Sequence, residues 1–367
     1  MTKLEQTKNA FKVIGKVTRI DKDGAYKEEV AQKGKRQGDT YRSLRFGVKT
    51  SETNEITVSM YDYEPEEVFL WNSDKRKKDE SYKGERIPFG TWEEQQEELR
   101  EQGYAVLQTR IGVTHKEDGK IDSKGLPSYV ASEMIYNNVD NGDTVVIEGT
   151  IRYSTYENNE GKTIEQKTYK IEKLHKIKDV DFEDEKFEEV SYFEQQMVFV
   201  GIDVDNREGK GYVTGRVIDY YGEYHDTQFV VHINDEEGNE DEGMRKLVDT
   251  LSKKVKFGDV INVFGDTVNR VIIEEAEDTE EKDPFAEFGG KSKPKHAQTY
   301  TNRTYINEMS IYGVDAWDKG VYKEEDFIVD ELVEDAKENP FADEFGGKGK
   351  KNPFDSDGEI SEDDLPF

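Results

Sequence analysis

Basic and aromatic side chains gather in the first half of the chain. A single nucleic-acid strand is held without sequence preference by cations that follow its phosphates and by aromatic rings that stack on its bases, at roughly 1–3 kcal/mol per base. Residues of both kinds are Lys16, Lys33, Lys35, Arg36, Tyr41, Arg45, Lys49, Tyr61, Trp71, Arg152 and Tyr156. The mixture predicts a surface for single-stranded DNA. The alternative, for any one cation, is an ordinary solvated surface position.

Five segments that alternate between apolar and polar residues must position these side chains. Such alternation is typical of half-buried strands. The strands are predicted at 11–20, 41–49, 56–61, 143–153 and 167–177, with a helix at 129–138. In the second strand Leu44, Phe46 and Val48 are expected to face inward, which turns its cations outward. This order predicts an OB-fold, a five-stranded barrel that binds oligonucleotides through one face and through the loops between strands one and two and between strands four and five.

A long insertion is expected inside this first barrel domain, which is predicted to span residues 1–185. The insertion covers 64–128 and begins with a charged loop that contains Lys75 to Lys78. A helix is predicted at 92–102 and a strand near 104–113. The segment 21–40 is predicted to be a loop rich in glycine and lysine.

The barrel pattern recurs in the second half of the chain, which indicates a duplication. The matches pair Val13–Val17 with Val213–Val217, 46–48 with 229–231, Gly142-Asp143 with Gly258-Asp259, and Thr168-Tyr169 with Thr304-Tyr305. A short helix precedes each Gly-Asp pair. A second OB-fold-like domain is therefore predicted over 190–326.

This second barrel is expected to be the weaker binder. Its predicted face holds Arg216, Tyr220 and Tyr224, but Gln228 stands where the first repeat has Arg45. No clear third strand is visible between His232 and Met244. An acidic linker at 274–298 separates its last two strands.

Charge is unevenly distributed along the chain. The net charge of −30 alone argues against nucleic-acid binding, because phosphate contacts need Lys and Arg. However, residues 1–60 hold 13 Lys and Arg against 8 Asp and Glu, whereas 327–367 hold 4 Lys against 13 Asp and Glu. This asymmetry indicates a nucleic-acid surface and an acidic tail in one molecule.

Several other classes of function find no support in the sequence. The chain has no cysteine, hence no disulfide and no thiol nucleophile. No nucleophile–base set, phosphate-binding loop or catalytic carboxylate pair stands out, so we expect no enzymatic activity. Asp203 and Asp205 only echo calcium-loop spacing, and no metal or cofactor is expected. No apolar run is long enough to span a membrane and no signal-peptide core is present, which favours the cytosol.

The chain ends in an acidic segment, predicted to be disordered over 327–367, that closes in a Leu-Pro-Phe tip. The last residues are Asp363, Asp364, Leu365, Pro366 and Phe367. Phe367 is an apolar anchor with its own carboxylate, and Pro366 pre-sets an extended backbone that loses little entropy on binding. The acidic residues suit a basic rim around a hydrophobic pocket. For an acidic run without this tip, a solubilising role would be the simpler interpretation.

This tip closely resembles that of bacterial and phage single-stranded DNA-binding proteins. The resemblance implies that the tip does not bind DNA but docks enzymes of replication, recombination and repair, such as a polymerase, helicase, primase or nuclease. It is specific only over the last five to ten residues, and the family homotetramer does not carry over. With two barrels per chain a monomer is compatible with the sequence. A phage protein would act in the cytosol of its bacterial host.

The sequence thus predicts a mainly β protein of two OB-fold-like barrels in tandem, with an acidic linker and an acidic tail. Its expected function is to coat single-stranded DNA and recruit partner enzymes. One alternative is an acidic adaptor or DNA mimic that binds basic replication enzymes. Another is RNA binding by the same barrels.

Overall fold

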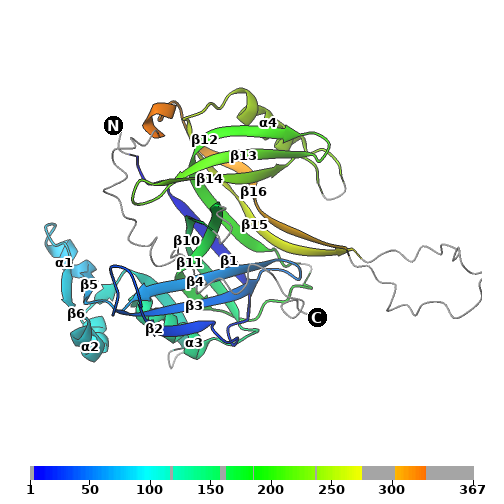
Figure 1. The fold of residues 1–367 in the computed structure, drawn as a ribbon. Coiled ribbons are helices and arrows are strands. Elements are labelled where there is room, and N and C mark those ends of the chain that lie inside the picture. Colours follow the sequence, from blue (N-terminus) through cyan, green and yellow to red (C-terminus); the bar gives the residue numbers. More distant parts are fainter. Residues whose placement is uncertain are drawn as a thin grey trace, which may run out of the picture.

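The computed structural model describes residues 4–115, 119–157, 163–184, 186–235, 238–274 and 302–327. The predicted linker from residue 275 onward and the predicted tail beyond Phe327, with its tip, lie outside these residues. Figure 1 shows two barrels, one above the other, with the insertion at the side of the lower barrel.

The first barrel closes through the strand pairing of an OB-fold. Its strands are β1 (Asn9–Thr18), β3 (Thr40–Lys49), β4 (Glu55–Tyr63), β10 (Thr144–Glu157) and β11 (Thr163–Lys176). β1 pairs antiparallel with β3 and β10, β3 pairs with β4, and β10 pairs with β11. β4 and β11 run parallel and complete the ring. The helix α3 (Ser128–Asn138) precedes the fourth strand, as predicted.

Alternation along these strands sets the barrel interior. Leu44, Phe46 and Val48 are at most 2% exposed, so the inward face of β3 is the predicted one. A Cβ atom on Gly149 would lie 1.9 Å from the carbonyl oxygen of Lys170, at the bulge between β10 and β11. Only glycine allows the two strands to approach this closely.

The second barrel repeats the topology of the first. Its strands are β12 (Val190–Asp205), β13 (Lys210–Ile218), β14 (Tyr224–His232), β15 (Val260–Glu274) and β16 (Asn302–Asp318). β12 pairs antiparallel with β13 and β15, whereas β14 and β16 run parallel. The helix α4 (Glu242–Lys253) again precedes the fourth strand. The mainly β, OB-fold-like class is therefore confirmed for both barrels.

Two of the sequence matches between the repeats are wrong by one strand. Val213–Val217 lies on β13, the second strand of its barrel, whereas Val13–Val17 lies on the first. Likewise 46–48 belongs to a second strand and 229–231 to a third. The third strand that seemed missing is therefore β14, and the overlooked element is β12. The error arose because V-x-G-x-V suits any barrel strand that bends at a glycine.

Of the other two matches, one is correct and one is out of register. Gly142 and Gly258 both adopt a left-handed backbone, with φ of 88° and 86°, in the turn that leads into the fourth strand. Thr168-Tyr169 and Thr304-Tyr305 both lie on the fifth strands, but at different positions. Gly149 pairs with Ile171 and Gly265 with Ile311, so Tyr169 corresponds to Met309 and not to Tyr305.

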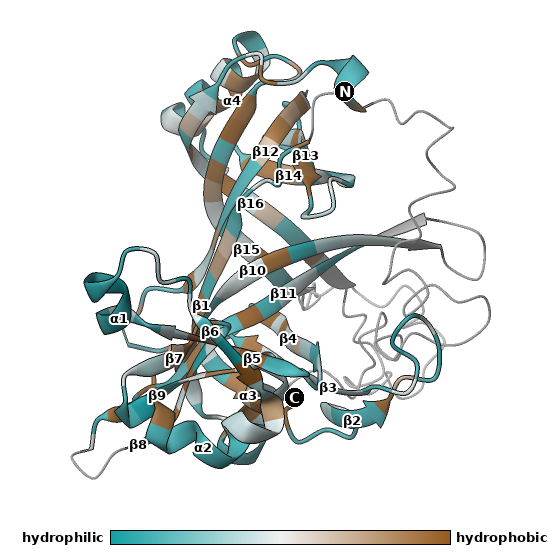
Figure 2. Cartoon of the chain, turned by 90° about the vertical axis from the view of Figure 1, so that its left-hand side faces the viewer, coloured by the Kyte–Doolittle hydropathy of each residue, from teal (hydrophilic) through white to brown (hydrophobic). Residues whose placement is uncertain are grey.

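The insertion builds a small module of its own beside the first barrel. It contains β5 (Glu67–Asn72), α1 (Ser73–Lys78), β6 (Glu85–Pro88), α2 (Phe89–Glu101), β7 (Tyr104–Val106), β8 (Thr109–His115) and β9 (Ile121–Leu126). β6, β5 and β7 form a separate three-stranded sheet, while β8 joins the main sheet through β11. α1 is among the most hydrophilic elements in Figure 2.

Three local predictions need correction. The charged loop containing Lys75 to Lys78 is the helix α1, because the Asn72 side chain accepts hydrogen bonds from the backbone N–H groups of Asp74 and Lys75 and caps it. The strand expected near 104–113 is two strands, β7 and β8. The loop at 21–40 contains β2 (Tyr26–Val30), an edge strand whose polar residues hide the alternation.

The two barrels are joined by direct strand pairing. β1 and β12 run antiparallel, with Phe11 opposite Phe193. The predicted division between residues 185 and 190 stays a prediction, because this pairing makes both barrels part of one continuous sheet.

A buried polar network reinforces that junction. The Glu189 carboxylate accepts hydrogen bonds from the Thr50 hydroxyl and the Asn54 amide, both at 2.6 Å, and pairs with Arg270 at 3.0 Å. Asn54 is fully buried and also bonds the Thr267 carbonyl at 3.1 Å. These groups come from both barrels, so the network fixes their relative orientation.

Candidate nucleic-acid interface

Three tyrosine rings gather at one end of the outer face of β3 and β4. Tyr41 lies 5.1 Å from Tyr61 and 5.9 Å from Tyr63, and Tyr61 lies 5.6 Å from Tyr63, measured between ring centroids. Alternation places them there, because Tyr41 is the Cα partner of Tyr63 and Ser43 that of Tyr61. We call these three residues the tyrosine cluster. Tyr63 is buried, whereas Tyr41 and Tyr61 are half-buried and remain partly exposed.

Arg36 reaches the tyrosine cluster from the loop between β2 and β3. Its guanidinium carbon lies 4.1 Å from the centroid of the Tyr63 ring, within the range of a cation–π contact. The same side chain pairs with Asp39 at 2.7 Å. The loop also carries Lys33 and Lys35, which are exposed. The loop between β2 and β3 thus places Arg36 beside an aromatic ring and carries two further cations.

A small residue separates two cations on the neighbouring part of this face. Strand pairing puts Arg45 opposite Ser59, and Ser59 opposite Lys170 of β11. Ser59 is 9% exposed, so its small side chain projects little from the surface between Arg45 and Lys170. Beside the tyrosine cluster, the small residue Ser59 therefore has the cations Arg45 and Lys170 on either side of it.

Arg152 lies close enough to Lys170 to affect the pKa of its ammonium group. Burial lowers the pKa of the Lys170 ammonium, and the charge of Arg152 lowers it further. Burial raises the pKa of the nearby Asp62 carboxyl, although the charges of Lys170, Arg152 and Arg36 oppose that shift. A phosphate placed here would therefore relieve repulsion between two cations.

Two further cations lie next to each other, Lys49 on β3 and Lys16 on β1. They are direct Cα partners across the β1–β3 pair. Both already have acidic neighbours: Lys49 pairs with Glu52 at 3.3 Å and Lys16 with Asp179 at 3.6 Å. Glu52 and Asp179 are well exposed, so such pairs are weak and can exchange for phosphates.

The predicted residues of the second barrel do not form a comparable surface. Arg216 is held by both oxygens of Asp226, at 2.6 and 2.8 Å. Its guanidinium carbon also lies 4.3 Å from the ring centroid of Tyr224 and 4.5 Å from that of Phe327. Phe327 ends the 3-10 helix η3 (Glu324–Phe327) and is buried. Arg216 and Tyr224 are thus covered, whereas Tyr220 is 79% exposed in the β13–β14 turn.

The strand pairing also corrects the match between Arg45 and Gln228. Arg45 faces Ser59, which is the Cα partner of Lys170 on the fifth strand. In the second barrel Tyr212 faces Val230, the partner of Ser310 on its fifth strand. Tyr212 therefore occupies the position of Arg45, and Gln228 does not.

Two predicted residues lie away from the tyrosine cluster or cannot be placed. Trp71 belongs to β5, in the separate sheet of the insertion. The side chain of Tyr156 lies outside the described part of the chain. Two residues were missed, Tyr63 and Lys170. Tyr63 could have been found from its two-residue spacing to Tyr61, which places both on one face of a strand. Lys170 could not, because no sequence pattern shows that β11 runs beside β4.

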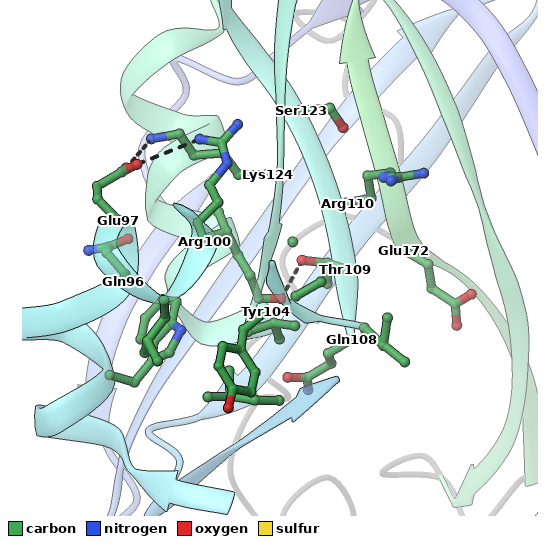
Figure 3. Close-up of a pocket in the computed structure, with 18 residues that line it drawn as sticks. Gln96, Glu97, Arg100, Tyr104, Gln108, Thr109, Arg110, Ser123, Lys124 and Glu172 are labelled. Atoms are coloured by element: carbon green, nitrogen blue, oxygen red, sulfur yellow. Dashed lines mark hydrogen bonds and ion pairs between the residues drawn. The ribbon is translucent and has the colours of Figure 1, made fainter. Parts of the chain in front are cut away.

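A pocket of about 420 Å³ lies between the insertion and β11 (Figure 3). Its lining includes Trp92, Gln108, Arg110 and Glu172. Two of its cations are already neutralised: Lys124 pairs with Glu97 at 2.8 Å, and Arg100 pairs with Asp122. Because these cations are paired, we interpret the pocket as part of the packing contact between the insertion and the barrel. Among the described residues, no group of three or more acidic or histidine side chains could hold a metal ion.

Comparison with known proteins places the chain in a family. Solved structures with a similar arrangement include a deletion variant of the single-stranded DNA binding protein from Thermus aquaticus, at a TM-score of 0.38 and 10% identity over 84% of this chain and 94% of that one. The wild-type protein gives a TM-score of 0.36 and 11% identity over 85% and 93%. No curated protein matches the sequence. No helix among the described residues is long and apolar enough to cross a membrane. The YorF family model matches residues 87–339, which is more than half of the chain, and the chain therefore belongs to the YorF family.

Proposed function

We propose that the chain binds single-stranded DNA, with little preference for base sequence, along the outer face of β3 and β4 in the first barrel. The observation that carries the proposal is the tyrosine cluster with Arg36 at its edge. Bases would stack on the accessible faces of Tyr41 and Tyr61. Arg45, Lys170 and Arg152 would follow the phosphates.

The topology supports this choice of surface. In an OB-fold the face of strands two and three and the adjoining loops are where oligonucleotides bind. Here those strands are β3 and β4, and the first of those loops supplies Lys33, Lys35 and Arg36. Stacking and phosphate contacts carry no base code, so the expected binding is tolerant of sequence and sensitive to salt.

Its role would be to coat exposed strands during replication, recombination or repair, as a binding protein rather than an enzyme. Partner enzymes would dock on the tip Asp363–Phe367, a proposal supported by the Leu-Pro-Phe sequence alone. Binding of RNA by the same face is the closest competitor, because stacking and phosphate contacts are common to both strands.

The test is the anisotropy of a labelled dT oligomer titrated with the full chain across a salt series. Tight binding that weakens linearly in log salt is expected, with a slope of about −0.7 for each phosphate contacted. A matched rU oligomer separates DNA from RNA preference. Absence of binding to both oligomers at low salt would refute the proposal and favour the acidic adaptor.

A further inference from the structure

The three-stranded sheet of the insertion has one covered and one open face. Val68 and Leu70 of β5 are buried against α2, where they meet Phe89 and Trp92. Residues on alternate positions of β5 must point the other way. Those residues are Phe69, which is 39% exposed, and Trp71, which is half-buried. Phe69 and Trp71 therefore lie on the face of the sheet away from α2, and both are at least partly exposed there.

A third aromatic residue lies beside this face. The ring of Trp71 lies 5.6 Å from that of Tyr82. Phe69 lies over Gly84, where an added Cβ would come within 2.3 Å of its ring. Gly84 has φ of 88°, a conformation that favours glycine, and its bare backbone leaves room for the ring. Phe69, Trp71 and Tyr82 together form what we call the insertion strip.

Cations surround the insertion strip, and the acidic groups nearby are largely engaged. Residues 73–86 hold six Lys and Arg against four Asp and Glu. Glu85 accepts from Lys75 at 2.8 Å and from Tyr104 at 3.0 Å, and Asp79 accepts from Ser81. Lys78 and Lys83 are exposed and form no ion pair with any described residue. Arg76 is tied to the strip, donating to the Tyr82 carbonyl at 3.2 Å.

We propose that the insertion strip is a second contact surface for single-stranded DNA, separate from the tyrosine cluster. Partly exposed aromatic rings, with the exposed Lys78 and Lys83 in the same segment, match a strand that offers stacking faces and phosphates together. The two surfaces are close along the chain, because only residues 64–66 lie between the end of β4 and the start of β5. One strand can therefore run from the tyrosine cluster onto the insertion. This inference extends the proposed function to a longer footprint.

The first test compares short and long oligomers on full-length variants. Trp71→Ala is expected to weaken binding of a long dT oligomer about fivefold or more, and to leave a short one unchanged. Tyr61→Ala should weaken both. If Trp71→Ala changes neither, the inference is overturned. If Tyr61→Ala changes neither while Trp71→Ala weakens the long oligomer, the insertion strip stands and the proposed barrel face fails.

A second variant guards against simple misfolding of the insertion. Lys78→Ala with Lys83→Ala removes only exposed charge, and should reduce the salt slope for the long oligomer by about 1.4 if each lysine meets one phosphate. Lys246→Ala with Lys254→Ala, two exposed lysines on and beside α4, is the matched control and should leave the slope unchanged. An equal slope change in both double variants would overturn the proposal.

A third arm tests a different occupant of the strip, the chain's own acidic tail. Quenching of Trp71 fluorescence by poly-dT, assigned by its loss in Trp71→Phe, supports DNA on the strip. If poly-dT leaves Trp71 emission unchanged but removal of residues 328–367 shifts it, the tail occupies this face and the proposal is wrong.

Discussion

Phe11 and Phe193 lie directly opposite each other across the β1–β12 pair, and they hold equivalent places in their own barrels. Phe11 is the partner of Gly149 on the fourth strand, and Phe193 is the partner of Gly265. An antiparallel contact in which equivalent residues meet is the mark of a two-fold axis. The two barrels are thus related as subunits of a symmetric dimer are, within one chain.

This internal symmetry makes the difference between the two faces informative. Both barrels share topology, yet only the first keeps an accessible aromatic and basic surface on its second and third strands. In the second barrel the position of Lys49 is taken by Arg216, which is paired with Asp226 and covered by Phe327. The shared topology therefore indicates a duplication, whereas the residues on the outer faces of the second and third strands differ between the two barrels.

Breaking the network at the junction should destabilise the whole chain. Asn54→Ala removes bonds to Glu189, the Thr267 carbonyl and the Asn269 N–H, and it leaves buried groups without partners. We expect a loss of about 3 kcal/mol in the free energy of unfolding, measured by urea denaturation. Asn138→Ala, which loses one exposed bond to Met134, should cost less than about 1 kcal/mol. Equal losses would show that the polar network at the junction contributes no more to the free energy of unfolding than an exposed hydrogen bond does.

Two arginines on the predicted binding faces, Arg152 and Arg216, should behave differently. Arg152→Ala is expected to weaken binding of dT oligomers and lower the salt slope by about 0.7, because it removes a cation from the proposed path. Arg216→Ala should leave both unchanged, since Asp226, Tyr224 and Phe327 already occupy that guanidinium. The check is a salt series on both variants, and a larger effect from Arg216→Ala would contradict this account.

Removing the acidic tail should tighten DNA binding at low salt. A polyanion tethered to the chain competes with DNA for its cations at high effective concentration. The truncation should end at Phe327, because that residue packs on Tyr224 and Arg216. The expected gain in dT affinity fades as salt screens the competition. Unchanged affinity at low salt would refute the competition, though not docking by the tip.

Asp259 should make part of the stability dependent on acid. Burial raises the pKa of its carboxyl, but hydrogen bonds from the Gly320 N–H, the Trp317 indole and the Lys256 N–H outweigh this and hold the pKa below its ordinary value. A depressed carboxyl pKa contributes stability above the unfolded value near ~3.9, and this is lost as the pH falls through the folded value.

Asp259→Asn is therefore expected to cost about 2 kcal/mol at pH 7 and less at the most acidic pH at which the chain stays folded. Urea unfolding of both chains at the two pH values measures this difference. A cost that is the same at both pH values would show that the charge of Asp259 is not what matters.

The sequence predicted the frame of the fold better than the composition of the site. Period-2 alternation located the strands of the first barrel, because inward residues along the middle of each strand, such as Leu44 and Phe46, are apolar. The first strand of the second barrel was missed because Val190–Asp205 mixes polar residues into both faces where it crosses from one barrel to the other.

The site depends on contacts that only pairing across strands reveals. Lys170 joins Arg45 because β11 runs parallel to β4, a non-local relation that alternation cannot show. Arg216 and Tyr224 are covered by Phe327, more than a hundred positions away along the chain. Such long-range partners are invisible to local patterns.

The central claim is that the tyrosine cluster stacks on the bases of a single strand, and substitution of Tyr61 tests it most directly. The measurement is the dissociation constant of a short labelled dT oligomer at fixed salt, for Tyr61→Ala, Tyr61→Phe and the control Tyr305→Ala, an exposed tyrosine on β16. Tyr61→Ala should weaken binding by at least about fivefold, while Tyr61→Phe, which keeps the ring, and Tyr305→Ala should bind as the unaltered chain does. Unaltered binding by Tyr61→Ala would contradict the account.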